Sequence, residues 1–89
     1  MIERELTVSN RLGLHARATA KLVQLLSAYK SNVTLTAKGR EVNAKSIMGV
    51  MLLAAGQGNQ VKLLVDGEDE GTACDAVAML FERRFDEDS

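Results

Sequence analysis

The apolar residues of this chain switch repeatedly between two spacings, and this switching limits the folds open to it. Over residues 2–8, 33–37 and 61–65 they occupy every second position, which is typical of strands with one buried face. Over residues 16–29 and 72–81 they recur every three or four positions, which is typical of helices with one buried face. This alternation predicts a mixed fold, in which helices cover the apolar face of a sheet.

Two shorter segments complete the pattern. The Lys-Gly pair at residues 38–39 predicts a tight turn into a further strand around Val42. Residues 47–55 carry no charge, follow a serine suited to cap a helix and end at a glycine, so they predict a second helix. The order is therefore β-α-β-β-α-β-α, a two-layer α+β fold in which Asp69 or Thr72 caps the last helix.

Length and charge exclude several functions. Eighty-nine residues leave room for a single domain, residues 1–89, in which we expect residues 86–89 to form a frayed acidic tail. Eleven Lys and Arg against twelve Asp and Glu give a net charge of −1, which provides no overall attraction to nucleic acids or anionic lipids. The aromatic residues fall on predicted helices or at their ends, which argues against an RNA-binding domain that stacks bases on its sheet.

Cysteine content and hydropathy indicate the compartment. One cysteine cannot form an internal disulfide, and the first residues lack the apolar core of a signal peptide. The longest apolar run, residues 47–56, has about half of the length that a membrane span needs. We therefore expect a cytoplasmic protein with no membrane insertion. The chain has no metal-ligand spacing such as C-x-x-C and no phosphate-binding glycine loop, so we expect no metal or other cofactor.

The single histidine, His15, has the clearest chemical potential. It stands directly before a predicted helix, where the unpaired N–H groups of Ala16 and Arg17 and the helix dipole would stabilise a bound anion. The Arg17 guanidinium adds donors suited to phosphate oxygens. A neutral imidazole is a nucleophile, so His15 is able to accept a phosphoryl group and release it again. The alternative is that His15 only orders its loop and Arg17 is a solvated helix residue.

The second predicted helix, residues 47–55, has no polar face, so part of it must be exposed. We expect Met48 to face outward, where a flexible side chain suits contact with partner proteins, while one set among Ile47, Val50, Met51 and Ala54 packs inward. The alternative is a short helix that is simply buried. Ser46 is a natural N-cap, and a phosphate on it would stabilise this helix while repelling acidic partners of the neighbouring surface.

Two motifs together resemble one known family. Residues 13–17 (GLHAR) before an amphipathic helix, and residues 45–51 (KSIMGVM) at the second helix, resemble HPr, the histidine-containing phosphocarriers of the bacterial phosphoenolpyruvate-dependent phosphotransferase system. The resemblance runs from about residue 2 to residue 85 and includes the order of the elements. It implies an open-faced β-sandwich, in which three helices cover one side of a four-stranded antiparallel sheet.

The resemblance also implies a role for each candidate residue. His15 matches the histidine that takes a phosphoryl group from enzyme I on Nδ1 and passes it to IIA proteins or domains, as a carrier rather than an enzyme. Arg17 matches the arginine that assists this transfer. Ser46 matches a serine that HPr kinase/phosphorylase modifies in many members, which reduces acceptance from enzyme I. The hydrophobic docking surface implied for the partners comprises Ile47, Met48 and Met51.

One position departs from the family. Proline usually follows the active-site arginine, whereas this chain has Ala18. Loss of the proline loosens the start of the helix without removing a reacting group, because proline there only presets φ. We therefore expect carrier activity to survive, with an altered transfer rate or phosphohistidine lifetime.

Two related functions remain as alternatives. One is NPr, a carrier in a nitrogen-related regulatory chain, although residues 45–49 (KSIMG) favour HPr. The other is a regulatory binding protein that acts through Ser46 alone, although the presence of both His15 and Arg17 argues against it. We expect a monomer, because self-association would cover the exposed second helix.

Overall fold

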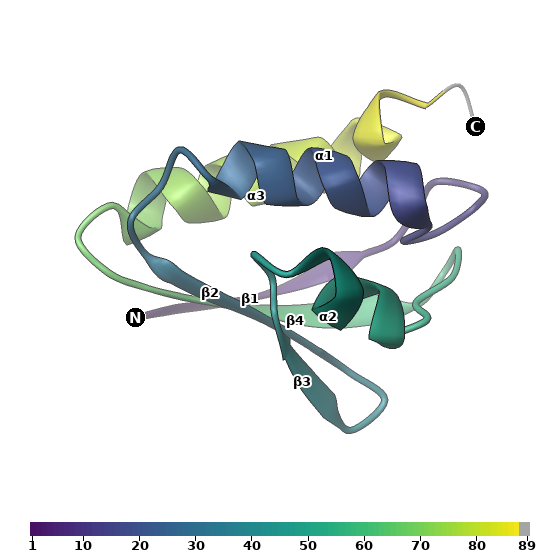
Figure 1. The fold of residues 1–89 in the computed structure, drawn as a ribbon, viewed down its shortest axis with the longest axis horizontal. Coiled ribbons are helices and arrows are strands. Elements are labelled where there is room, and N and C mark those ends of the chain that lie inside the picture. The colour runs from purple at the N-terminus through teal and green to yellow at the C-terminus, as the bar shows by residue number, and fades with distance from the viewer. Residues whose placement is uncertain (88–89) are drawn as a thin grey trace.

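Over residues 1–87, which the computed structural model describes, helices lie on one side of an antiparallel sheet (Figure 1). The elements are β1 (Ile2–Thr7), α1 (Ala16–Leu26), β2 (Asn32–Ala37), β3 (Arg40–Asn43), α2 (Ile47–Leu52), β4 (Gln60–Asp66), α3 (Glu70–Glu82) and a 3₁₀ turn, Arg84–Asp86. The strand order across the sheet is β1-β4-β2-β3. Both the predicted element order and the α+β class are confirmed.

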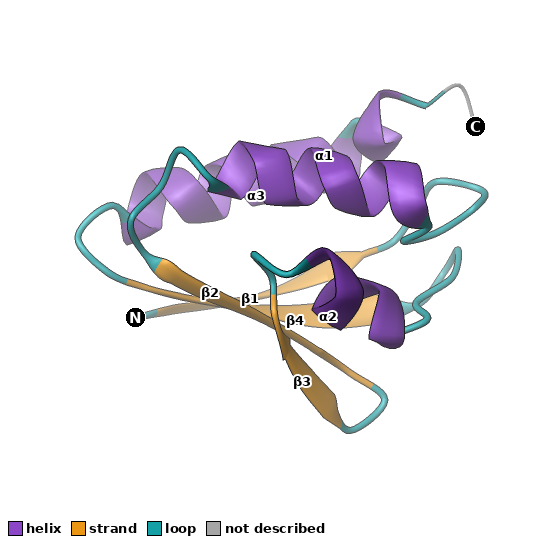
Figure 2. Ribbon diagram, viewed as in Figure 1, coloured by secondary structure: helices purple, strands orange, loops and turns teal. Residues whose placement is uncertain are grey.

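The sheet register places the apolar residues of neighbouring strands on one face. Leu35 of β2 lies opposite Leu63 of β4, Val33 lies opposite Val65, and these four side chains are buried. The helices cover this face, as Figure 2 shows. Each fully buried side chain of this size contributes about 1.5–3 kcal/mol, so the alternating pattern of the strands drives the formation of the two layers.

The predicted helix ends differ from the observed ones. α1 ends at Leu26, and Tyr29 lies in the loop that follows rather than in the helix. α2 ends at Leu52 instead of residue 55, and Ala54 beyond it has a left-handed φ of 50°. Its apolar composition continued past the point where the backbone leaves the helix, so hydropathy overestimated its length. No helix in residues 1–87 is long and apolar enough to cross a membrane.

Asp86 and Glu87, the first two residues of the predicted frayed tail, are held in place by contacts with the rest of the protein. Asp86 closes the 3₁₀ turn, and Glu87 hydrogen-bonds to side chains of the N-terminal half. Phe85 is fully buried, with its ring centroid 4.9 Å from that of Phe81, and its carbonyl accepts a 2.8 Å hydrogen bond from Lys21. The buried aromatic ring therefore fixes the chain end against α1 and α3. Residues 88–89 lie outside the described residues.

Asp69 joins two loops at the opposite end of the sheet from this turn. Its carboxylate accepts hydrogen bonds from the backbone N–H of Lys30 at 2.8 Å, and from the N–H and hydroxyl of Ser31 at 2.9 and 2.5 Å. The Ser31 hydroxyl, followed by the Lys30 N–H, holds the pKa of Asp69 below its ordinary value of 3.8. The side chain thus ties the start of α3 to the α1–β2 loop instead of capping the helix.

We predict that Asp69→Asn lowers the free energy of unfolding in a pH-dependent way. The folded pKa is depressed, so the stabilisation is present above pH 3.8 and is lost as the pH falls through the folded pKa. Urea unfolding of both proteins is expected to show a difference at neutral pH that shrinks in acid. Asp75→Asn is the control, since the exposed Asp75 only approaches Arg4 at 3.6 Å. A difference that does not change with pH would contradict the prediction.

Candidate functional site

His15 occupies the N-cap position of α1. Its backbone is extended, with φ −80° and ψ −179°, and its carbonyl accepts the first helical hydrogen bond from the N–H of Thr19 at 2.9 Å. The imidazole does not cap the helix and is 28% exposed. This geometry presents the ring at the positive end of the helix, where a bound anion is stabilised.

Gly13 brings the His15 loop into close contact with the segment after α2. Its φ is +69°, and a Cβ on it would lie 2.5 Å from the carbonyl oxygen of Ala55 and 2.8 Å from Cα of Gly56. The same segments are joined by a 2.9 Å hydrogen bond from the N–H of Leu14 to Ala55. Only glycine combines a favourable positive φ with the absence of a Cβ, so Gly13 sets the position of His15 relative to α2.

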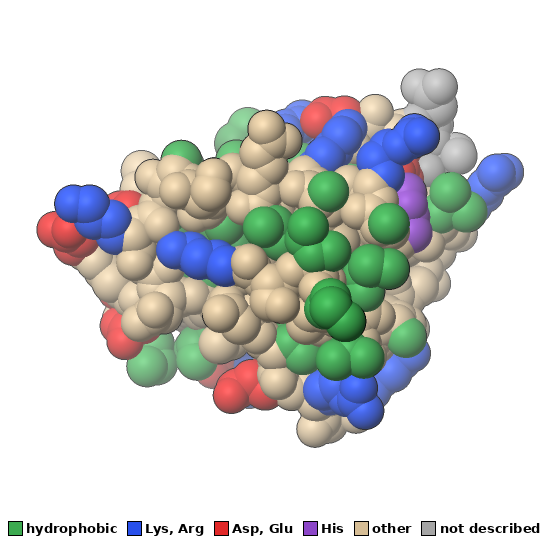
Figure 3. All heavy atoms as spheres, viewed as in Figure 1, with side chains coloured by type: hydrophobic (Ala, Val, Ile, Leu, Met, Phe, Trp, Pro, Cys, Tyr) green, Lys and Arg blue, Asp and Glu red, His purple; other side chains and the backbone are tan. Residues whose placement is uncertain are grey.

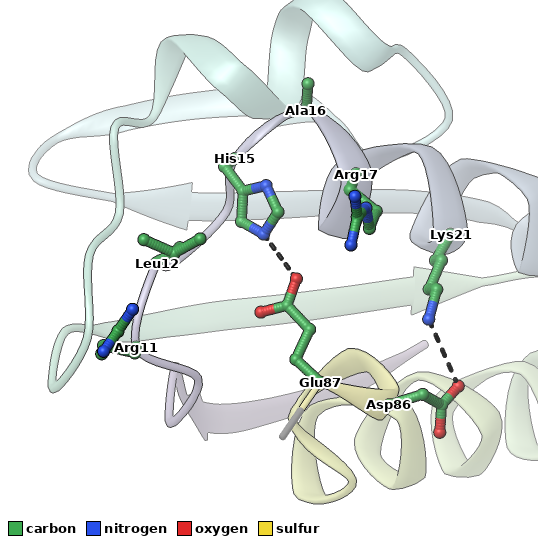
Figure 4. Close-up of a pocket in the computed structure, with 8 residues that line it drawn as sticks. All are labelled: Arg11, Leu12, His15, Ala16, Arg17, Lys21, Asp86 and Glu87. Atoms are coloured by element: carbon green, nitrogen blue, oxygen red, sulfur yellow. Dashed lines mark hydrogen bonds and ion pairs between the residues drawn. The ribbon is translucent and has the colours of Figure 1, made fainter. Parts of the chain in front are cut away.

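The two nitrogens of the His15 ring have different surroundings. Nε2 lies 2.5 Å from a carboxylate oxygen of Glu87 (Figure 4). Nδ1 points away from Glu87, toward the start of α1, and no group within residues 1–87 hydrogen-bonds to it. The nitrogen nearer the start of α1 is therefore the one that is open to an incoming group.

Basic and acidic residues line the pocket beside the His15 ring. His15 borders an open pocket of about 560 Å³, and the three basic residues that line it are Arg11, Arg17 and Lys21. Two acidic residues, Asp86 and Glu87, close the other side. A hydrogen bond from Asn10, aided by His15 and Arg17, holds the pKa of Glu87 below its ordinary value. The pocket thus combines an ionised carboxylate with donors suited to a phosphoryl group.

The second predicted motif lies beside this pocket. Ser46 caps α2, because its Oγ accepts a 3.1 Å hydrogen bond from the N–H of Gly49. Met48 is 77% exposed, as expected, but of the four residues considered for the inward set only Val50 is buried, because the helix is too short to cover more of its surface. The exposed residues, here called the α2 surface, are Ile47, Met48, Met51 and Leu52. Figure 3 shows apolar side chains gathered next to the histidine, with basic side chains around them.

Sequence reasoning missed several residues that the fold brings to this region. Arg11 and Leu12 belong to the loop before His15, and only the folded loop places them in the pocket. Lys21 had a signal in the sequence, since it follows Arg17 by four residues and shares its helix face. Glu87 is 72 residues from His15 and had no such signal. Ala18, at the usual proline position, is completely buried on the inner side of α1.

The fold and the site define a class, small proteins that carry a phosphoryl group on a histidine at a helix N-terminus. Residues 2–83 match the family model described as the PTS HPr component phosphorylation site. The chain is 67% identical over 89 residues, the full length of both, to the phosphocarrier protein HPr of Xylella fastidiosa strain Temecula1. It is 54% identical over 87 residues, 98% of each chain, to that of Cupriavidus necator.

A solved structure agrees with the sequence relatives. An HPr crystal structure from Thermoanaerobacter tengcongensis superposes with a TM-score of 0.96 and 43% identity, covering 100% of both chains. The chain therefore belongs to the HPr family. It is a phosphocarrier of the phosphotransferase system, with the histidine phosphorylation site of that family, rather than an enzyme. The interpretation as HPr rather than NPr is confirmed.

We predict that Gly13→Ala destabilises the protein and displaces the His15 loop. Gly39→Ala is the matched control, since Gly39 has a similar φ of +76° but a Cβ added to it would meet no atom within 4 Å. Backbone strain alone costs about 1–2 kcal/mol, and the clash with Ala55 adds to it in Gly13→Ala. Urea unfolding and amide chemical shifts would measure both effects. Equal losses in the two variants would contradict the proposed close contact.

Proposed function

We propose that His15 accepts a phosphoryl group on Nδ1 from enzyme I, with phosphoenolpyruvate as the source, and donates it to IIA proteins or domains. The observation that carries this proposal is the orientation of the ring. Nε2 faces Glu87, while Nδ1 faces the start of α1. A neutral imidazole attacks phosphorus through its unprotonated nitrogen, and the resulting P–N bond is reactive enough to pass the group onward.

The residues that follow His15 hold the transferred group. The first helical N–H with an intrahelical partner is that of Thr19, which bonds to the carbonyl of His15. The N–H groups of Ala16 and Arg17 therefore remain at the helix start as donors for phosphoryl oxygens. An anion at such a position gains about 0.3–1 kcal/mol from the helix dipole. The Arg17 guanidinium supplies further donors and balances the added charge.

The partner proteins dock on the α2 surface, with Ile47, Met48 and Met51 at its centre. Basic residues lie on two sides of it (Figure 3): Arg17 and Lys21 line the pocket, while Lys38 bonds to the carbonyl of Ala54 and Arg40 to that of Leu52, at the end of α2. The whole chain has a net charge of −1, so this concentration of cations is local. An apolar patch with a basic rim fits acidic partner surfaces, which supports docking of enzyme I and IIA.

Regulation acts through Ser46. Phosphorylation of its hydroxyl by HPr kinase/phosphorylase places about −1.5 to −2 charges at the start of α2, directly beside the α2 surface. The charge stabilises the helix N-terminus but repels an acidic partner, which lowers acceptance from enzyme I. The carrier acts as a cytoplasmic monomer, so the α2 surface stays accessible. The competing alternative is regulation through Ser46 alone. It does not explain why Nδ1 of His15 is accessible or why three basic residues line the pocket beside it.

We predict one acid-labile phosphoryl group on the wild-type chain after incubation with phosphoenolpyruvate and enzyme I. Intact-mass analysis is expected to show no adduct on His15→Ala, which lacks the acceptor. Arg17→Ala is expected to accept the group at least about tenfold more slowly, because it loses donors to the developing charge. Absence of an adduct on the wild type, with another HPr phosphorylated alongside, would contradict the proposal and favour a different donor or the Ser46-only regulator.

We predict that Ser46→Asp slows acceptance from enzyme I more than Ser46→Ala does. Both substitutions change the cap, and the alanine variant is expected to lose about 1 kcal/mol of stability. Only the aspartate adds a negative charge beside the α2 surface. Initial rates of phosphorylation would separate the two effects, and equal rates in both variants would show that charge at this position does not control docking.

A further inference from the structure

Asn10 is a buried polar residue that connects the chain end to the His15 loop. It is completely inaccessible to solvent, and its Nδ2 donates hydrogen bonds to the carbonyl of Gly13 at 2.8 Å and to Glu87 at 2.9 Å. Both partners are acceptors, so the amide nitrogen rather than the amide oxygen must face them. The side chain of Asn10 therefore holds the carboxylate of Glu87 in one position.

Glu87 uses its two oxygens on two different partners. One accepts from Asn10, and the other contacts Nε2 of His15 at 2.5 Å (Figure 4). The side chain is 14% exposed, which limits competition from water. The Asn10 hydrogen bond holds the pKa of Glu87 below its ordinary value, so the group is an ionised acceptor. An ionised carboxylate only accepts hydrogen bonds, so Nε2 must carry the proton.

The C-terminal turn keeps Glu87 at this place. The buried ring of Phe85 anchors the turn two residues earlier, and Lys21 donates to the carbonyl of the same residue. Arg84, Phe85 and Asp86 all have left-handed φ values of 55–61°. Such a backbone is unfavourable for residues other than glycine and persists where surrounding contacts enforce it. The geometry of residues 84–86 is thus set by packing rather than by local preference.

We propose that Glu87, held by Asn10, is a positioning residue for phosphoryl transfer that keeps the proton of His15 on Nε2 and leaves the lone pair on Nδ1. This inference rests on the proposed function of His15. A carboxylate that fixes the tautomer of a reacting histidine has the same physical effect as the aspartate of a catalytic triad, where loss of the correct tautomer is costly.

The carboxylate also balances the charge of the transfer step. The lone pair of Nδ1 attacks phosphorus, and the bond between phosphorus and its donor atom breaks with the electron pair remaining on the donor. The ring, still protonated on Nε2, becomes positively charged and faces the negative charge of Glu87. In the reverse direction, the leaving group is a neutral imidazole rather than an imidazolate. The same contact therefore assists both acceptance and donation.

Glu87→Gln tests this role. A glutamine offers one oxygen and one NH₂ group to two donors, so it cannot accept from Asn10 and His15 together. Glu82→Gln is the matched control, because Glu82 is exposed at the end of α3 and has no hydrogen bond through its side chain within residues 1–87. Two measurements on the full chain are needed: the rate of phosphorylation by enzyme I, and the tautomer ratio from ¹⁵N shifts of the neutral ring.

The expected result is a rate at least about tenfold lower for Glu87→Gln, together with a larger fraction of the Nδ1–H tautomer, while Glu82→Gln matches the wild type in both. A wild-type rate or an unchanged tautomer ratio in Glu87→Gln would overturn the inference and leave the proposed function intact. Failure of the wild type itself to accept a phosphoryl group would overturn the proposed function and this inference with it.

Discussion

The close contact between the His15 loop and the segment after α2 determines how the functional parts of this protein are arranged. A glycine at position 13 lets the loop approach Ala55 and Gly56 closely, and the Leu14–Ala55 hydrogen bond holds it there. Because α2 ends just before this segment, the contact fixes the histidine beside the exposed apolar helix. The proposed acceptor and the proposed docking surface are thereby held next to each other, as transfer between proteins requires.

Charged side chains are distributed unevenly over the surface, although the net charge of the protein is only −1. The chain has nearly equal numbers of acids and bases, yet several basic side chains gather near His15 and near the end of α2. Such a local concentration of cations suits the proposed phosphoryl group and acidic partners without making the whole protein basic, so nonspecific binding to nucleic acids gains little. Ser46 lies at the start of α2, and a phosphate there would change the field at the proposed docking surface without altering His15.

The C-terminal turn shows how a residue distant in sequence becomes part of a site. Burial of Phe85 offsets a strained left-handed backbone and brings Glu87 against His15, where Asn10 orients its carboxylate. The acidic composition of residues 86–89 suggested a solvated tail, because composition reports the preference of an isolated segment. At Asp86 and Glu87 the packing of one aromatic ring overrides that preference, and no local pattern in the sequence shows where the ring will lie.

The sequence by itself determined the element order, the Ser46 cap, the exposure of Met48 and the position of His15 before a helix. These features depend on periodicity and on neighbours a few residues away, which a sequence displays directly. Only the tertiary structure decided the early end of α2, the basic residues that line the pocket, the accessible Nδ1 of His15 and the contact of Asn10 and Glu87 with His15. These depend on which segments meet in space, and contacts across as many as 77 residues are set by packing of the whole core rather than by any local spacing.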